Sequence, residues 1–452
     1  MKKFLRSRFF NEYGMVFVLL GLIAYFAAGT WEVQYPENTG AAENLAEKIL
    51  KDGGANQNIL IFTTTNRTVV AFSETLNVQL TAGGARIVET VSGEPMDLGR
   101  ALQKLGEANT RVDVIATHHR VAEWDMLEPK TFQAVWAGDF PSLKNATVIE
   151  PETHMWFSFL TWDNLMDLLN QNADIAIMAI GMTLVIITAG IDLSVGKLLA
   201  LSTVTTAWLI VNQTSGPEAS IWALLACGAA GVAACAALGT FSGVMVAAFS
   251  IPPFVITLSI MFIARGLAYL MTDAAAAIPV KHADATWLGL ERSVLGIPNA
   301  AVLMILLFIM AHVVMTHTRF GRHIYAVGGN PEAARLSGVP VKWMLVLVYG
   351  ICGALAGLAG LVQGSRLSSG GAQFGEGYEL SVIAAVVVGG TSLAGGEGRI
   401  MGTLIGAMII GVIRKGMNMN EVEPFKQYIV FGTLILAAVL LDQLKRRWRQ
   451  AA

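Results

Sequence analysis

The sequence has little charge. Only 14% of its 452 residues are Asp, Glu, Lys or Arg, whereas about 25% is usual for a soluble chain, and 54% are hydrophobic. A chain of this composition has too few polar side chains to cover a water-exposed surface. Most of it is therefore expected to lie in a lipid bilayer or to be buried among membrane helices.

Cysteine, excess positive charge and phosphate-binding loops are also scarce or missing. The three cysteines lie in uncharged apolar stretches without metal-ligand spacing, so we interpret them as small packing residues. A net charge of −2 gives no basic face for a nucleic acid. The segment 190–197 has five residues between its glycines and is followed by Leu198, which does not fit a phosphate loop. Hydrolysis of ATP would therefore require another polypeptide.

The charge that is present is concentrated near the start of the chain. The 122 residues from Pro36 to Phe157 hold 10 Lys or Arg and 16 Asp or Glu. In this part, strand-like runs at 58–63, 86–91 and 112–116 alternate with helix-like runs at 68–81 and 95–108. This alternation is typical of a small parallel sheet covered by helices. We therefore expect a small α/β domain, inserted into a membrane protein.

Apolar runs that can cross a bilayer make up most of the remaining chain. Residues 219–264 contain no charge and suffice for two spans, broken at Ile251-Pro252-Pro253. The other runs are 13–28, 173–190, 198–211, 298–315, 343–362, 380–393, 400–413 and 428–441. The run at 13–28 also fits a secretory signal, but we favour an uncleaved span. The sequence thus predicts an all-α polytopic membrane bundle of about ten transmembrane helices.

Four parts of the chain follow from this pattern. Residues 1–30 form a cytoplasmic tail and the first span, 31–157 the α/β insert, 158–444 the membrane core and 445–452 a basic tail. Because cytoplasmic loops are enriched in Lys and Arg, both termini and the loop 316–342 are expected in the cytoplasm, and the insert outside it. Arg414 and Lys415 do not fit, so either they reach the interface from a helix end or the count is wrong locally.

Small residues recur at every fourth position in two of the spans. One ridge comprises residues 227, 231, 235, 239 and 243, and the other comprises residues 352, 356, 360 and 364. Such ridges let helix backbones approach closely in lipid, so they predict tight packing between helices.

A polar segment, 190–196, interrupts two apolar spans. It contains Asp192, which is costly at membrane depth unless it is paired or hydrated. The segment either forms a break that lines a transport path or is an ordinary turn, in which Asp192 or Ser194 caps the following helix.

Two further segments depart from the apolar pattern. The loop 328–341 predicts a short helix over 332–337, in which Pro331 suits the first turn, Glu332 suits the positive end and Gly338 ends the helix. It is either a lever for a soluble partner or a solvated loop. The segment 388–399 holds five glycines, which permit close backbone approach.

Isolated polar residues give weaker signals. Arg265 is alone in an apolar run and is a candidate for a buried functional charge, with Asp192 as a candidate partner. His118 and His119 in the insert are adjacent and therefore point apart, which makes a poor metal site. We interpret these two histidines as plain surface residues.

Taken together, segments 181–196, 318–338 and 386–399 resemble the membrane permeases of ABC-type sugar importers, the family of the ribose, xylose, arabinose and galactose permeases. The likeness extends from about Phe159 to Asp442. It implies binding-protein-dependent sugar import across a bacterial inner membrane, by a dimer with a second permease copy or a paralogue. It further implies cytoplasmic ATPase subunits that hold ATP and Mg, and an extracytoplasmic solute-binding protein. This chain itself would bind no cofactor or metal, would bind no nucleic acid and would catalyse no reaction.

The resemblance also suggests roles for individual residues. Those that match the motif for coupling to the ATPase are Glu332, Ala333, Ala334 and Gly338. Those that we assign to the translocation path and its signature loops are Gly190, Asp192, Ser194, Gly196, Arg265, Gly389, Gly390, Thr391, Gly395 and Gly396. The long insert departs from the family pattern, and our hypothesis is that it assists or modifies capture of the solute.

Two other functions fit the residues. An ion- or proton-coupled secondary transporter would use Asp192 and Arg265 as a relay and would follow an ion gradient instead of ATP. A membrane-anchored sensor would bind a ligand in the insert without moving solute, but a sensor needs few spans.

Overall fold

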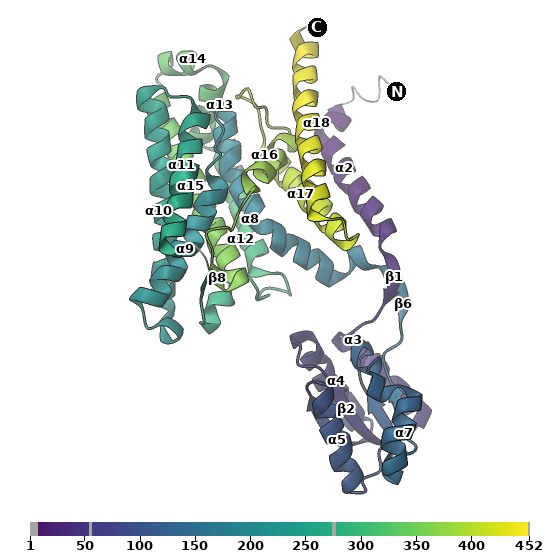
Figure 1. Cartoon of the computed structure of the whole chain (residues 1–452). Coiled ribbons are helices and arrows are strands. Elements are labelled where there is room, and N and C mark those ends of the chain that lie inside the picture. Colours follow the sequence, from purple (N-terminus) through teal and green to yellow (C-terminus); the bar gives the residue numbers. More distant parts are fainter. Residues whose placement is uncertain (1–7, 54–56, 274–276, 451–452) are drawn as a thin grey trace. The chain divides into compact units, whose positions relative to one another are not determined.

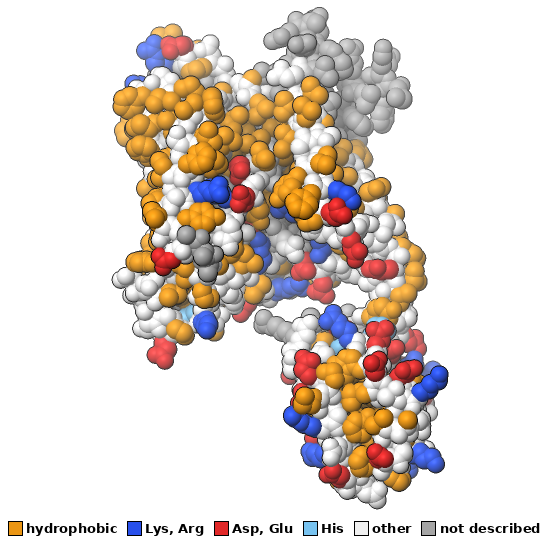
Figure 2. Space-filling view, viewed as in Figure 1, with side chains coloured by type: hydrophobic (Ala, Val, Ile, Leu, Met, Phe, Trp, Pro, Cys, Tyr) orange, Lys and Arg blue, Asp and Glu red, His pale blue; other side chains and the backbone are white. Residues whose placement is uncertain are grey.

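A computed structural model describes residues 8–53, 57–273 and 277–450 of the chain and divides it into two compact units (Figure 1). The helical unit comprises the described residues up to Thr30 together with those from Phe159 onward. The α/β unit comprises Trp31–Ser158. Figure 2 shows a largely hydrophobic surface on the helical unit, whereas the α/β unit carries side chains of both charges.

The α/β unit is built on a four-stranded parallel sheet in the order β3-β2-β4-β5. Its strands are β2 (Asn58–Thr63), β3 (Arg86–Ser92), β4 (Val114–Ala116) and β5 (Thr147–Ile149). Its helices are α3 (Thr39–Gly53), α4 (Arg67–Ala82), α5 (Pro95–Glu107), α6 (His119–Ala122) and α7 (Pro129–Asp139). Three of the strands and two of the helices lie where the sequence predicts them.

Alternation along β2 explains why helices cover both faces of the sheet. Ile59 and Ile61 are buried on one face with residues of α3 and α4. Leu60 and Phe62 are buried on the other face with residues of α5 and α7. A strand that is apolar on both faces requires this three-layer arrangement.

Both chain connections of the α/β unit run side by side. Strand β1 (Trp31–Gln34) pairs antiparallel with β6 (His154–Phe157), so that Trp31 lies opposite Phe157. Gln34 Nε2 also donates to Ser158 Oγ at 2.6 Å. The two ends of the α/β unit are therefore held together by β1 and β6, and the unit is inserted into the sequence of the helical unit between Thr30 and Phe159.

The helical unit has seven helices, within the described ranges, that are long and apolar enough to cross a membrane. These are α8 (Trp162–Ile187), α9 (Val195–Gln213), α10 (Ile221–Phe249), α11 (Pro253–Met271), α12 (Asn299–His317), α15 (Val341–Leu367) and α17 (Ile400–Met419). Three more, α2 (Arg8–Gly29), α16 (Tyr378–Val388) and α18 (Pro424–Gln450), contain shorter apolar stretches. Short elements complete the unit, namely α13 (Arg319–Gly329), α14 (Pro331–Leu336), β7 (Ile278–Pro279) and β8 (Ser369–Gly370).

Some expected spans have different bounds in the structure. Helix α8 begins eleven residues before the predicted 173 and ends at Ile187, and α16 ends at Val388 instead of continuing to 393. The polar first turns of α8 and the glycines after Val388 explain why hydropathy misplaced these ends. Helix α18 continues through most of the predicted basic tail, whose side chains lie outside the described part of the chain.

The basic pair that did not fit the predicted topology faces other helices. Arg414 donates to Ser381 Oγ at 3.0 Å, and its guanidinium lies 5.4 Å from the Tyr378 ring centroid. Lys415 Nζ lies 4.0 Å from Asp167 Oδ2 on α8. Both cations therefore have partners within the bundle.

The two predicted small-residue ridges lie at helix contacts. A Cβ on Gly239 of α10 would lie 2.4 Å from the Tyr349 carbonyl oxygen of α15, and Gly353 is equally close to the Cys235 carbonyl oxygen. The second ridge, on α15, instead contacts α8 through Cys352 at Gly181, and α9 through Gly360. The first ridge therefore brings α10 onto α15, and the second holds α15 against two other helices.

Gly239 provides a test of this packing. We expect Gly239→Leu to lower the free energy of unfolding by about 1–3 kcal/mol, the usual cost of overpacking, because the added side chain would force α10 away from α15. The measurement is the thermal midpoint of the detergent-solubilised protein. Gly266→Leu on α11 is the control, since nothing lies within 4 Å of a Cβ at that position. Equal midpoints for the two variants would contradict this packing.

Candidate functional site

The three segments singled out in the sequence meet at one place in the helical unit. The backbone N–H of Gly396 donates to the carbonyl oxygen of Ile187, at the end of α8, over 2.8 Å. A Cβ on Gly328, near the end of α13, would lie 1.7 Å from the same oxygen. Tyr325 Oη of α13 donates to the Gly398 carbonyl oxygen at 2.8 Å. We call this contact of residues 187–189, 325–329 and 395–398 the motif junction.

The short helix α14 projects from this junction. Asn330 caps it, because its Oδ1 accepts hydrogen bonds from the N–H groups of Glu332 at 3.1 Å and Ala333 at 3.0 Å. Arg335 Nη2 lies 2.8 Å from Glu332 Oε2 across one turn. Leu336 is 83% exposed. The sequence predicted this helix, but it missed the cap, which comes from Asn330.

The inner side of α14 is anchored. Ala334 is buried, and its carbonyl oxygen accepts from the Val339 N–H at 3.0 Å. Gly338 adopts a φ of +83°, which ends the helix and turns the chain toward α15. Within this helix only Ala334 is buried, and the other five residues are exposed.

Segment 190–196 forms a true break and not a simple cap. Asp192 is fully buried, and its Oδ1 accepts from the Ser194 N–H at 2.9 Å and from Ser194 Oγ at 2.6 Å. Neither side chain caps α9. Ala189 begins the break with a φ of +62°, a left-handed conformation that is unusual for alanine.

The break also lies deep in the bundle. Gly190 lies beside the Tyr349 hydroxyl, and Asp192 beside the Cys352 thiol of α15. Cys352 is eleven residues beyond the start of α15, about 16 Å along the helix.

The glycine-rich segment after α16 forms a compact loop. Gly390, Gly395 and Gly396 all adopt positive φ values. Gly389 lies close to the backbone of α17, 2.7 Å from the Gly402 carbonyl oxygen when a Cβ is placed on it. Thr391 is buried between these turns. The glycines are therefore required by close approach and by backbone conformation.

Arg265 does not join this site. It is half-buried on α11, and its guanidinium lies 5.8 Å from the Tyr269 ring centroid. Asp192 makes its hydrogen bonds to Ser194, and no ion pair joins Asp192 to Arg265 in the described part of the chain. The proposed pairing of these two residues was wrong, because α11 presents Arg265 to its own helix turn.

Buried charges that the sequence analysis passed over lie in the same bundle. Lys197 in the first turn of α9 is 5% exposed, and its Nζ lies 3.6 Å from Glu376 Oε2. Arg366 Nη2 of α15 lies 2.6 Å from the fully buried Asp174 Oδ2 of α8. A single charge in an apolar span, such as Asp174, was the available signal for the second pair.

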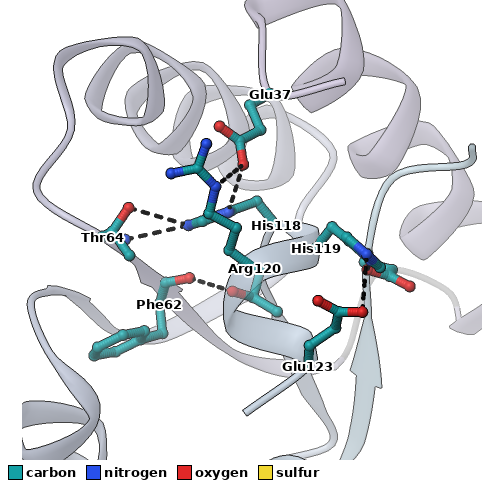
Figure 3. A network of polar contacts seen from close by, with 9 residues as sticks. Glu37, Phe62, Thr64, His118, His119, Arg120 and Glu123 are labelled. Atoms are coloured by element: carbon teal, nitrogen blue, oxygen red, sulfur yellow. Dashed lines mark hydrogen bonds and ion pairs between the residues drawn. The ribbon is translucent and has the colours of Figure 1, made fainter. Parts of the chain in front are cut away.

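The histidine pair of the α/β unit is not a plain surface feature, which corrects our interpretation. His118 is fully buried at the carboxyl end of β4, with Nδ1 3.0 Å from Glu37 Oε1 and Nε2 3.3 Å from Thr64 Oγ1 (Figure 3). His119 stacks on Tyr35 at 3.6 Å between ring centroids. The two histidines therefore fasten the chain that enters the unit to the end of β4.

The hydrogen bond from His118 holds the pKa of Glu37 below its usual value. Because this carboxylate has a lowered pKa in the folded state, its contribution to stability is present at neutral pH. That contribution is lost as the pH falls through the lowered pKa. Within the described ranges, no group of three or more His, Cys, Asp or Glu side chains could hold a metal ion.

Comparison with known proteins finds a family that matches most of the helical unit. Residues 164–439 match the family described as "Branched-chain amino acid transport system / permease component". This match lies entirely outside the α/β unit. No solved structure matches the chain.

Curated relatives cover the same part of the chain. The ribose import permease protein RbsC of Escherichia coli (strain K12) is 46% identical over 295 residues, which are 64% of this chain and 88% of the relative. The D-allose transport system permease protein AlsC of the same organism is 37% identical, over 63% of this chain and 85% of the relative. Its probable ABC transporter permease protein YphD is 38% identical, over 63% and 83%. The chain therefore belongs to this family of ABC-importer permeases, and it is a multi-pass membrane transport subunit and not an enzyme.

Proposed function

We propose that this chain is the membrane subunit of an ATP-driven importer that moves a sugar across a bacterial inner membrane. The observation that carries this proposal is α14, a short helix with an exposed face that connects directly to the motif junction. The relatives of this chain include permeases named for the transport of ribose, allose and galactose. A sugar of this class, pentose or hexose, is therefore the expected solute.

In this proposal, α14 is where a cytoplasmic ATPase subunit pushes. Glu332, Ala333, Ala334 and Gly338 form the coupling segment, and Leu336 presents an apolar side chain to the partner. A displacement of α14 moves α13, because only Asn330 separates the two helices. Through the motif junction, the displacement then reaches the end of α8 and the break before α9, which switches the bundle between two openings.

The remaining parts of the machine are supplied by other chains. ATP and Mg are held by two ATPase subunits, and this chain holds no cofactor. An extracytoplasmic binding protein delivers the solute, and a second permease copy or a paralogue completes the dimer. The signature loops around Gly190, Ser194, Gly389 and Gly395 line or control the path of the solute.

The expected topology follows from the same assignment. The seven long apolar helices, together with α2, α18 and the segment 368–388 that ends in α16, give the ten proposed crossings, with both termini in the cytoplasm. Figure 1 shows α14 at the same end of the helical unit as the end of α18, in agreement with a common cytoplasmic side. The α/β unit, which follows α2, then lies outside the cytoplasm. There we propose that it assists or modifies capture of the solute.

Charge reversal at Glu332 tests the coupling role. Glu332→Arg would break the pair with Arg335 and place a cation at the positive end of α14. We expect ATP hydrolysis by the reconstituted complex to continue while sugar uptake falls by about tenfold or more, equivalent to at least about 1.4 kcal/mol.

Glu423→Arg is the matched control. Glu423 also forms an exposed ion pair across three residues, at 3.3 Å to Lys426, near the start of a helix. This variant is expected to couple normally. Normal uptake by Glu332→Arg would exclude the lever role of α14.

The role of the α/β unit is tested by removing it while keeping the pairing between β1 and β6. Replacing residues 35–153 with Asn-Gly would join β1 and β6 as a two-residue hairpin, since Gln34 and His154 already lie opposite each other. We expect uptake to weaken mainly at low sugar concentration, which a measurement of rate against concentration detects. If both the maximal rate and the half-saturating concentration are unchanged, the insert has no part in capture.

A further inference from the structure

Two breaks of the helical unit are in contact with each other. The second break is the segment 368–377 between α15 and α16, and it begins at Ser368 with a φ of +47°. A Cβ on Gly196 of α9 would lie 2.4 Å from the Gly375 carbonyl oxygen, so the two backbones are in contact. The Gly371 N–H also donates to Thr203 Oγ1 of α9 at 3.3 Å. We call this contact the break junction.

The position of the second break follows from α16. This helix has only eleven residues and ends at the glycine-rich loop of the motif junction. Its start therefore lies about 16 Å along the helix axis from that loop. Within a membrane protein, irregular backbone is tolerated where protein surrounds it or where it lines a water-filled cavity.

Two helices begin at the break junction without side-chain caps. Ser194 before α9 makes no capping hydrogen bond through its side chain, and Gly377 before α16 has no side chain that could make one. The first N–H groups of a helix are unpaired and carry partial positive charge. A carboxylate such as Glu379 in the first turn of α16 is the expected complement to that charge.

Lys197 is the residue that packing and capping do not explain. It is a cation in the first turn of α9, where the helix dipole disfavours positive charge, and its side chain is 6% exposed. Its Nζ makes no hydrogen bond to any described residue, and neither does Oε2 of the neighbouring Glu379. A buried ammonium without hydrogen bonds is costly, so another function must favour it.

We propose that the break junction binds the hydroxyl groups of the transported sugar, with Lys197 as donor and Glu379 and Glu376 as acceptors. Sugars present many hydroxyl groups, each of which donates and accepts, and an adjacent ammonium and carboxylate satisfy both capacities. The side chain of Glu376 is 63% exposed, whereas that of Lys197 is 6% exposed, so their ion pair joins a buried group to an exposed one. This inference rests on the proposed function and adds the residues that recognise the solute.

The test uses the complex reconstituted with its ATPase and binding protein, and radiolabelled ribose and allose as probes. We expect Lys197→Met and Glu379→Gln each to lower ATP-driven uptake by about 10- to 100-fold, the effect of losing a charged hydrogen bond. Lys426→Met, which removes an exposed lysine of α18, is the matched control and is expected to transport normally. Size-exclusion profiles of each variant monitor folding.

A charge swap separates solute binding from a purely structural ion pair. In the double variant Lys197→Glu with Glu376→Lys, a structural pair would be restored, so recovered uptake would overturn the proposal. We expect no recovery. Wild-type uptake by Lys197→Met would also overturn it.

A binding measurement is independent of transport. We expect equilibrium binding of radiolabelled ribose and allose to the detergent-solubilised permease to be at least about tenfold weaker for Lys197→Met than for the wild type or for Lys426→Met. Equal binding by Lys197→Met and the wild type, or no binding by the wild type, would overturn the proposal. If the wild-type complex shows no ATP-driven sugar uptake, the proposed function fails. If the wild type and the Lys197 variants transport the sugar equally well, only the proposed binding site fails.

Discussion

The close approach of three backbones at the motif junction is the constraint on which the rest of the helical unit depends. The Ile187 carbonyl oxygen ends α8, accepts from the Gly396 N–H and lies against Gly328, where no side chain larger than hydrogen fits. Because backbone contacts of this kind cannot slide without losing hydrogen bonds, the ends of α8 and α13 and the glycine-rich loop are held as one piece. Any push on α14 must therefore reach the interior of the bundle.

Inside the bundle, two helices are preceded by irregular segments, whereas membrane-spanning helices are usually continuous. The breaks before α9 and α16 put polar backbone and the buried side chains of Asp192 and Lys197 inside the bundle, where burial of charge is expensive. The helices around them pack through small residues, so there is little freedom to absorb such groups by relaxation. In the proposed mechanism, the site that binds solute and the contacts that transmit movement are built from the same irregular segments.

The sequence predicted the elements well where a pattern was local, and poorly where tertiary contacts decided. The strand at 58–63 and the short helix from Pro331 were confirmed, because periodicity, proline and glycine are local signals. The convergence of three motifs was only implied by resemblance, since contacts between residues hundreds of positions apart leave no mark in a single sequence. The same limit applies to Lys197, which looked like part of a failed phosphate loop, and to His118, whose burial depends on Glu37.

The most direct test of the central claim is a distance measurement between spin labels at Arg335 of α14 and Arg399 beyond the glycine-rich loop, both exposed, in the assembled transporter. If the motif junction transmits movement as one piece, the distance distribution is the same with and without bound ATP, while labels across the bundle change their separation. A change in the distance between positions 335 and 399 on ATP binding would contradict the account, because α14 would then move without carrying the junction with it.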